Sequence, residues 1–382
     1  MAKNLGSLLF STAKRMVRLQ RKALKAANRP AVKAVKAVKS TKVARKPAIK
    51  LYKPAPNLNP AARAARKASG LAPTGAGRWK SFIHQPPLSM GRLLSRLPYS
   101  MYSPVDRPVA GLPLVVMLHG CQQTGYEMAL GTRMNWLADS KGFVVVYPQQ
   151  QKRIQAFGCW RWFKPEATQG YAEADTIADL VQTLVSRHKL DRRRVYVAGL
   201  SAGAGMAGLT ALRHPELFTA VALHSGAVLG DASNQASGLK TMRRGATEDP
   251  TQLIERILTP GPLFASIPAI ILHGARDHAV HPRNAYQLAQ QFVYVNVARG
   301  DRGVAEKVST LAMGTAREYE RHDFMLGKKP VVRLCLVKGL GHAWSGGDPD
   351  LKFNAREGPK ACLLIWQFFM QSSSHSQKLL DI

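Results

Sequence analysis

The stretch from Tyr196 to Gly208, YVAGLSAGAGMAG, contains two overlapping glycine motifs. Residues 199–203 read G-x-S-x-G, a turn that exposes a nucleophilic serine, here Ser201, between a strand and a helix. Residues 203–208 read G-x-G-x-x-G, a turn that binds the pyrophosphate of a dinucleotide. The two motifs belong to different chemistries, acyl transfer and hydride transfer, so the rest of the chain has to decide between them.

The dinucleotide interpretation lacks an acidic residue at the expected place. Such a site needs an Asp or Glu at the end of the following strand, about 20 residues on, to bind the ribose hydroxyls. That strand is predicted to end at His224-Ser225-Gly226, which contains no acid. We therefore interpret the glycines after Ser201 as positions that let a helix pack against a sheet, and a dehydrogenase becomes the weakest alternative.

Partners for a catalytic serine follow in the chain order of a nucleophile elbow, which is serine, acid and histidine. Asp277 comes just after the apolar run 269–274, and His342 follows the apolar run 332–337. Glycines just before His342 give its loop the freedom to bring the imidazole over Ser201. These positions predict a catalytic triad of Ser201, His342 and Asp277.

Two backbone N–H groups are expected to stabilise an oxyanion. One is that of Ala202, directly after the serine, and the other is that of Cys121, in the loop after an early apolar run. Gly199 and Gly203 allow the sharp turn around Ser201. This set of elements in the correct order favours acyl transfer, which requires no metal and no organic cofactor.

The predicted elements alternate between short apolar runs and amphipathic stretches. The predicted strands are 113–120, 143–148, 195–199, 219–224, 269–274 and 332–337, with an edge strand at 96–104. The predicted helices are 125–140, 173–188, 203–213, 284–295 and 358–371. This alternation predicts an α/β protein with a doubly wound, mostly parallel sheet. Residues 227–265 and 300–328 are predicted to be irregular insertions.

Charge divides the chain into two parts. The sequence has 55 Lys and Arg against 23 Asp and Glu, a net charge of +32, and no acid precedes Asp106. We predict a basic, largely disordered arm at 1–80 with a cationic helix at 1–27, a catalytic domain at 81–372 and a tail at 373–382. The arm suits a polyanion such as nucleic acid, anionic lipid or a granule surface, or it serves only as a soluble linker.

Apolar runs long enough for a membrane are not found in the sequence. A spanning helix needs about 18 apolar residues and a secretory signal about 7–15, whereas the N-terminal run covers only residues 8–10. We therefore expect no transmembrane segment, and no Sec signal can be read, which leaves the cytoplasm as one location. Four cysteines are too few for a disulfide scaffold in a chain of 382 residues.

With these residues, the chain resembles the poly(3-hydroxybutyrate) depolymerase family of esterases, which is similar to feruloyl and acetylxylan esterases. The resemblance is carried by LHGC at 118–121, GTRMN at 131–135, YPQ at 147–149, CWRWF at 159–163, the elbow, HG at 273–274 with Asp277, and GHAWSGG at 341–347. It implies an α/β-hydrolase fold over about 95–370 and a serine carboxylic ester hydrolase that uses Ser201, Asp277 and His342. It also implies that the protein is secreted, although no Sec signal can be read from the sequence.

The resemblance further implies an aromatic substrate surface, to which Trp160, Trp162 and Trp344 would map. Gln122, directly after Cys121, is also expected to contact the substrate. A disulfide between Cys121 and Cys159 would form in an oxidising compartment, since both lie in loops expected near the site.

The expected substrates are short-chain esters or poly- and oligo(3-hydroxybutyrate)-type polyesters. Two alternatives on the same fold stay open, a feruloyl or acetylxylan esterase and a serine peptidase, because a triad does not separate esters from amides. A third alternative is a polyanion- or granule-binding protein in which the hydrolase domain is incidental, and it depends on the basic arm.

Overall fold

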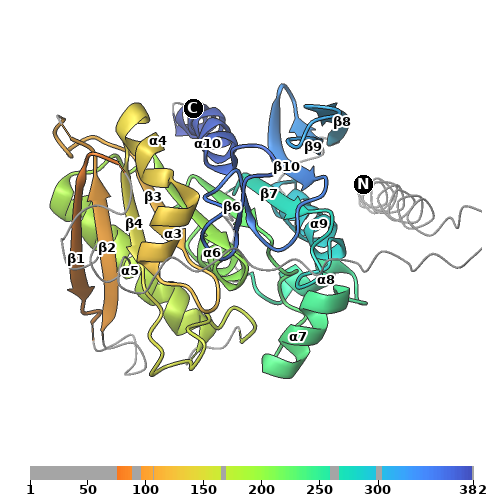
Figure 1. The fold of residues 1–382 in the computed structure, drawn as a ribbon, viewed down its shortest axis with the longest axis horizontal. Coiled ribbons are helices and arrows are strands. Elements are labelled where there is room, and N and C mark those ends of the chain that lie inside the picture. The colour runs from red at the N-terminus through yellow and green to blue at the C-terminus, as the bar shows by residue number, and fades with distance from the viewer. Residues whose placement is uncertain are drawn as a thin grey trace, which may run out of the picture. The chain divides into compact units, whose positions relative to one another are not determined.

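The computed structural model describes residues 75–87, 96–105, 107–164, 169–258, 266–297 and 303–380. Most of the basic arm, its expected helix at 1–27 and the proposed contact with a polyanion lie outside these residues. Figure 1 shows a central sheet in the described part, with helices on both of its faces.

Ten strands of the described residues form this sheet, in the order β1-β2-β4-β3-β5-β6-β7-β10-β9-β8. Their bounds are β1 Arg78–His84, β2 Leu97–Ser103, β3 Leu114–Leu118, β4 Val144–Pro148, β5 Val195–Leu200, β6 Ala220–His224, β7 Ala269–Gly274, β8 Ala305–Leu311, β9 Tyr319–Leu326 and β10 Lys329–Val337. The six strands from β4 to β10 at the centre are parallel, and the pairs at both edges are antiparallel. A separate parallel pair joins β11 (Trp344–Ser345) to β12 (Asn354–Ala355).

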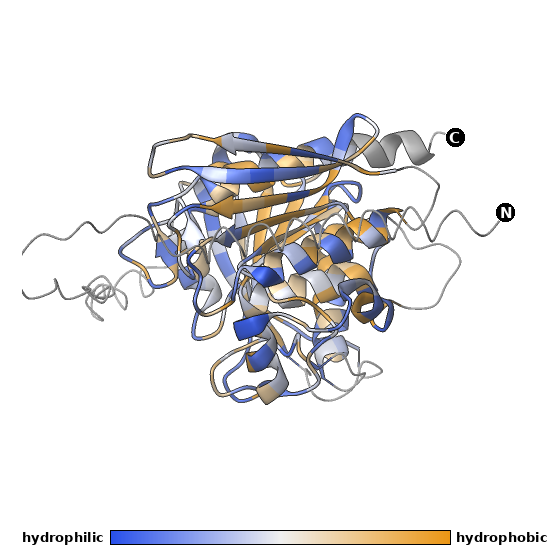
Figure 2. Ribbon diagram, turned by 90° about the vertical axis from the view of Figure 1, so that its right-hand side faces the viewer, coloured by the Kyte–Doolittle hydropathy of each residue, from blue (hydrophilic) through white to orange (hydrophobic). Residues whose placement is uncertain are grey.

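Helices cover the sheet in two layers. One layer contains α3 (Gly125–Thr132), α4 (Met134–Lys141) and α10 (Ala361–Leu380), and the other contains α5 (Gly170–His188), α6 (Ala202–Arg213) and α9 (Arg283–Val297). Two short helices, α7 (Gln235–Arg244) and α8 (Pro250–Glu255), lie in the connection between β6 and β7. Figure 2 shows the apolar central strands between the helices.

The predicted fold class and strands are confirmed. Strands β3 to β7 are buried on both faces, as expected for parallel strands between two helix layers. The single helix predicted over 125–140 is two helices, because Arg133 adopts a left-handed conformation with φ 61° that ends α3 and begins α4.

The two segments predicted to be irregular contain regular structure. Residues 227–265 include α7 and α8, and residues 300–328 include β8 and β9, which extend the sheet. The boundary expected at residue 80 falls inside β1, and the tail expected from 373 continues α10. Strands β1 and β8 are mostly exposed edge strands, so their sequences lack the apolar run that identifies a buried strand.

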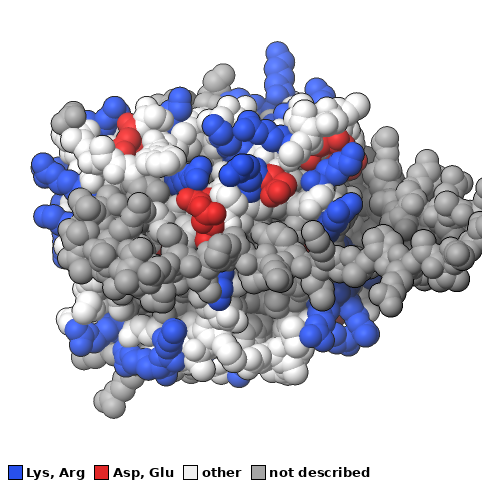
Figure 3. Space-filling model, in the orientation of Figure 1, with Lys and Arg blue, Asp and Glu red and all other residues white. Residues whose placement is uncertain are grey.

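The folded part of the chain is also basic at its surface. Figure 3 shows more Lys and Arg than Asp and Glu on the face that it draws. Some acids are engaged in ion pairs, such as Asp175 with Arg213 at 2.5 Å and Asp191 with Arg194 at 2.6 Å. The positive balance of the sequence therefore extends beyond the arm.

His322, within the segment 300–328, lies on β9 between two carboxylates. Its Nδ1 is 2.8 Å from Glu306 on β8, and its Nε2 is 2.5 Å from Glu320. Burial acts to lower the pKa of His322, but the hydrogen bonds and charges of the two carboxylates outweigh it and raise the pKa to about 9. The imidazolium therefore ties the edge strands of the sheet together.

We expect this ion pair to stabilise the fold by about 1–2 kcal/mol below pH 6.5 and to lose that contribution as the pH rises through 9. A raised pKa in the folded state means that the folded protein holds the proton more tightly, so deprotonation removes the stabilisation. The measurement is the free energy of unfolding of the wild type and of His322→Gln at pH 6 and pH 10. A difference between the two proteins that is the same at both pH values would contradict the prediction.

Candidate active site

Ser201 lies in a sharp turn between β5 and α6, with φ 57° and ψ −119°. A Cβ atom at Gly199 would lie 2.1 Å from the carbonyl oxygen of Gly203, and one at Gly203 would lie 2.1 Å from that of Leu118. Only glycine fits at either position. The N–H of Ser201 donates to the carbonyl oxygen of His224 at 2.9 Å, which helps to hold the strained serine in place.

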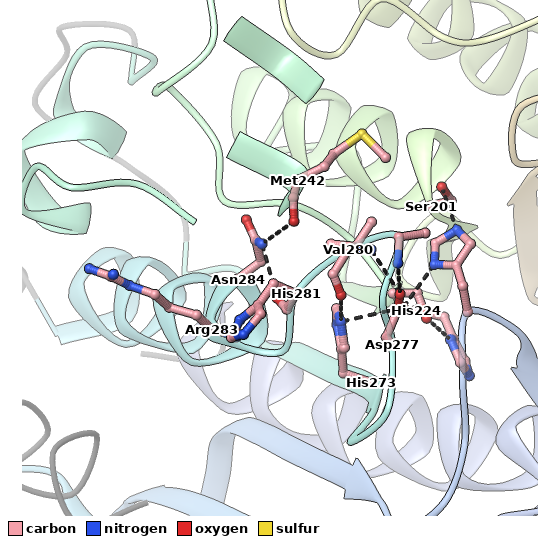
Figure 4. A network of polar contacts seen from close by, with 12 residues as sticks. Ser201, His224, Met242, His273, Asp277, Val280, His281, Arg283 and Asn284 are labelled. Atoms are coloured by element: carbon pink, nitrogen blue, oxygen red, sulfur yellow. Dashed lines mark hydrogen bonds and ion pairs between the residues drawn. The ribbon is translucent and has the colours of Figure 1, made fainter. Parts of the chain in front are cut away.

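The structure brings Ser201, His342 and Asp277 together at the carboxyl ends of the parallel strands. Figure 4 labels Ser201 and Asp277 in this network. The Oγ of Ser201 is 3.0 Å from Nε2 of His342, and Nδ1 of His342 is 2.8 Å from Oδ2 of Asp277. The three residues are separated by 65 and 141 positions in the chain, so the fold alone accounts for their contact.

Asp277 is buried and fixed by its own loop. Its Oδ1 accepts hydrogen bonds from the N–H groups of Ala279 at 2.9 Å and Val280 at 2.8 Å. Burial acts to raise its pKa, but the hydrogen bonds from His342 and from the N–H of Val280 act in the opposite direction, and the pKa lies below its usual value. An ionised Asp277 can only accept, which puts a proton on Nδ1 of His342 and leaves Nε2 free to accept from Ser201.

His119, His224 and His273 lie at the carboxyl ends of β3, β6 and β7, and their side chains are fully buried. Burial lowers the pKa of His119 to about 4 and that of His224 to about 3, and it also lowers the pKa of His273. His224 accepts from the N–H of Ser345 at 3.2 Å, and His119 accepts from the N–H of Gln150 at 3.1 Å. These uncharged rings anchor the loops of the site.

The two expected oxyanion donors lie beside the serine. A Cβ atom at Gly120 would lie 3.5 Å from the Cβ of Ser201, so the loop that carries Cys121 packs directly against the nucleophile. Ala202 is the first residue of α6, where backbone N–H groups have no acceptor within the helix. Neither N–H donates to another protein group in the described part of the chain.

A cavity of about 400 Å³ opens at Ser201. It is lined by Cys121, Gln155, Cys159, Trp162, Phe163, Ser201, Ala202, Ala227, Gln235, Ala236, Gly238, Leu239, Met242 and Val280. No charged side chain belongs to this described lining, and most of its members are apolar. The cavity therefore suits an uncharged, apolar group next to the serine.

Of the four residues expected to contact substrate, only Trp162 lines the cavity. Trp160 and Trp344 are fully buried. Trp160 donates to the carbonyl oxygen of His119 at 3.1 Å, and the ring of Trp344 stacks on that of His224 with 4.9 Å between the ring centroids. Gln122 is exposed and is not among the lining residues. The buried rings of Trp160 and Trp344 support the loops of the site, and none of the three positions belongs to the described lining of this cavity.

The wall formed by α7 was not predicted. It contributes Ala236, Leu239 and Met242, which are spaced three residues apart and therefore share one face of a helix. Asn234 caps this helix by accepting from the N–H of Ser237. This spacing after a capping residue was a usable signal, although the polar character of the whole segment concealed it.

Cys121 and Cys159 form a disulfide that borders the cavity. It links the loop after β3, which carries an expected oxyanion donor, to the segment that carries Trp160 and Trp162. Cys335 and Cys362 are buried free thiols, and burial raises the pKa of both to about 12.

The residues that the structure describes contain neither a cluster of metal ligands nor a membrane-spanning helix. None of their His, Cys, Asp and Glu side chains form a group of three or more that could hold a metal ion. None of the described helices combines the length and the apolar character needed to cross a bilayer.

The sheet order, the two helix layers and the elbow define an α/β-hydrolase fold. The structure is similar to that of an acetyl xylan esterase from Aspergillus awamori, with a TM-score of 0.56 and 22% sequence identity over 71% of this chain and 95% of that chain. The family model described as Esterase PHB depolymerase matches residues 97–311, and the chain belongs to this family.

The names of three similar proteins refer to different esterases. The chain is 32% identical over 247 residues to "Poly(3-hydroxyalkanoate) depolymerase C" of Paucimonas lemoignei, covering 61% of this chain and 55% of that protein. It is 30% identical over 205 residues to "Probable acetylxylan esterase A" of Aspergillus fumigatus (51% and 54%), and 30% identical over 223 residues to "Feruloyl esterase B" of Neurospora crassa (55% and 75%). The chain thus spans just over half the length of the first two relatives.

We expect loss of the disulfide to lower the free energy of unfolding by about 2–4 kcal/mol, because the bond closes a loop of 38 residues. The measurement is chemical denaturation of the wild type and of the Cys121→Ser, Cys159→Ser double variant, each with and without a reductant. The reductant should destabilise the wild type and leave the double variant unchanged. Equal stability of the two proteins without reductant would show that the bond contributes nothing.

Proposed function

We propose that this chain is a serine carboxylic ester hydrolase in which Ser201 is the nucleophile, His342 the general base and Asp277 the acid that orients it. The proposal rests above all on one observation, the continuous set of contacts from Ser201 Oγ to His342 Nε2 at 3.0 Å and from His342 Nδ1 to Asp277 at 2.8 Å. This is the arrangement that activates a serine hydroxyl for attack on an acyl carbon.

In the first half of the reaction, Ser201 Oγ attacks the ester carbonyl carbon while its proton passes to Nε2 of His342. The N–H groups of Cys121 and Ala202 donate to the developing oxyanion, and loss of one such donor typically costs about 3 kcal/mol in the barrier. The tetrahedral intermediate then collapses. The alcohol leaves with the proton from His342, and the acyl group stays on Ser201.

In the second half, a water molecule replaces the alcohol. His342 takes a proton from this water as its oxygen attacks the acyl-enzyme carbonyl carbon. The bond to Ser201 Oγ breaks, the serine recovers its proton from His342, and the free acid leaves. The charge of Asp277 stabilises the imidazolium in both halves, because its carboxylate faces Nδ1.

The cavity supports short-chain esters or oligomers and polymers of the 3-hydroxybutyrate type as substrates. Its described lining is uncharged and mainly apolar, and its volume of about 400 Å³ exceeds what an acetyl group fills. A feruloyl-type ester is the second candidate, since the adjacent Trp162 and Phe163 both line the cavity and offer aromatic surface.

We expect Ser201→Ala to lower kcat for p-nitrophenyl butyrate by at least about a thousandfold, and Asp277→Asn to lower it by a comparable factor, while the melting temperature changes little. Ser140→Ala is the matched control, because Ser140 is an exposed serine on α4 whose hydroxyl donates to the carbonyl oxygen of Leu137 in the same helix. The proposal fails if Ser201→Ala keeps more than a tenth of the wild-type rate.

A further inference from the structure

Much of the cavity wall belongs to one segment, residues 227–258, here called the cap segment. It supplies Ala227, Gln235, Ala236, Gly238, Leu239 and Met242 to the lining. Val228, Ala246 and Leu253 form a small hydrophobic cluster within it, and other apolar side chains of the segment, such as Leu229 and Ile254, are buried as well.

The cap segment is also held by a row of buried amide side chains on α9. Asn284, Gln287 and Gln291 are spaced three and four residues apart, so they lie along one face of the helix. Their exposed fractions are 0%, 2% and 0%. Buried amides are costly unless their donors and acceptors are satisfied, so a row of three indicates specific partners.

Two of these amides each bind both main-chain groups, N–H and carbonyl oxygen, of one residue in the cap segment. Gln287 accepts from the N–H of Ala246 at 2.9 Å and donates to its carbonyl oxygen at 2.8 Å. Gln291 accepts from the N–H of Leu229 at 3.1 Å and donates to its carbonyl oxygen at 2.8 Å. Each side-chain amide thus pairs with the irregular backbone of the cap segment as a neighbouring strand would.

Asn284 joins two separate parts of the cap segment. Its Oδ1 accepts from the N–H of Val228 at 3.1 Å, next to Ala227 in the cavity lining. Its Nδ2 donates to the carbonyl oxygen of Met242 at 3.0 Å, and Met242 itself lines the cavity. Figure 4 shows this contact close to the loop that carries Asp277.

The same carbonyl oxygen of Met242 also accepts from the N–H of His281 at 2.8 Å. His281 follows Val280, whose N–H donates to Asp277. The wall and the loop of the catalytic acid are therefore fixed at a shared point, and Asn284 is the side chain located there.

We propose that Asn284 is a positioning residue that sets the acyl-chain preference of the enzyme, because it holds Met242 and Val228, and with them the α7 wall, at a fixed distance from Ser201. This inference rests on the proposed function, since it takes the cavity to be the acyl site. Asn284 does not touch the reacting atoms. Removal of its side chain therefore changes the contacts of the acyl carbons far from the ester and leaves the contacts of the carbons next to the ester unchanged.

Chain-length dependence is the readout that separates this role from general support of the fold. Each methylene group buried against the wall should raise kcat/KM about fourfold until the cavity is full. The wild type should therefore prefer p-nitrophenyl hexanoate to the acetate by more than tenfold. In Asn284→Ala the wall is no longer fixed, so the increase in kcat/KM per methylene group should fall below twofold. The kcat for p-nitrophenyl acetate should stay within about threefold of the wild-type value.

Asn296→Ala is the matched control. Asn296 is a buried amide on the same helix, and it bonds to Ile267, Phe292 and Ser266, none of which belongs to the cap segment. We expect it to lower the melting temperature about as much as Asn284→Ala does and to keep the wild-type chain-length profile. If Asn284→Ala does not fold, Asn284→Leu preserves the volume without either hydrogen bond and tests the same point.

The outcomes distinguish the two proposals. If the wild type hydrolyses none of the esters, the proposed function fails. If the wild type is active and Asn284→Ala lowers kcat/KM equally for acetate, butyrate and hexanoate, or if both asparagine variants flatten the profile equally, the positioning role is overturned. A flattened profile in Asn284→Ala alone supports it.

Discussion

The close packing of main-chain atoms around Ser201 constrains the rest of the site. The carbonyl oxygens of Gly203 and Leu118 occupy the space that side chains at positions 199 and 203 would need. This closeness lets β3, β5 and α6 meet at one point, so that the serine and the loop of Cys121 are neighbours. The remaining parts of the site are loops brought toward that point by adjacent parallel strands.

The charge balance around Asp277 and His342 depends on neighbouring histidines that are buried in their uncharged form. His224 and His273 end neighbouring strands close to Asp277 and His342, and burial lowers the pKa of both. Because these rings stay neutral, Asp277 is the charge that acts most directly on His342. The buried rings then serve as rigid hydrogen-bonding supports, as the bond from Ser345 to His224 illustrates.

The sequence was sufficient for the centre of the molecule and for the residues that meet at Ser201. Buried parallel strands give unbroken apolar runs, and the order of Ser201, Asp277 and His342 along the chain follows from the order of those strands. The edge strands β1 and β8 were missed, because exposed strands carry no such run. The expected roles of Trp160 and Trp344 depended on which way each ring points, and neither spacing nor composition records that direction.

The structure of the cap segment was not predicted for a related reason. The amide side chains that hold it lie on α9, which is distant in sequence. Those amides bind main-chain atoms, and main-chain atoms are the same whatever side chains the segment carries. Residues of the cap segment that face the cavity can therefore be exchanged while its anchorage to α9 stays the same. Such an arrangement allows the substrate range to diversify through substitutions in one surface segment, with the sheet and the serine left as they are.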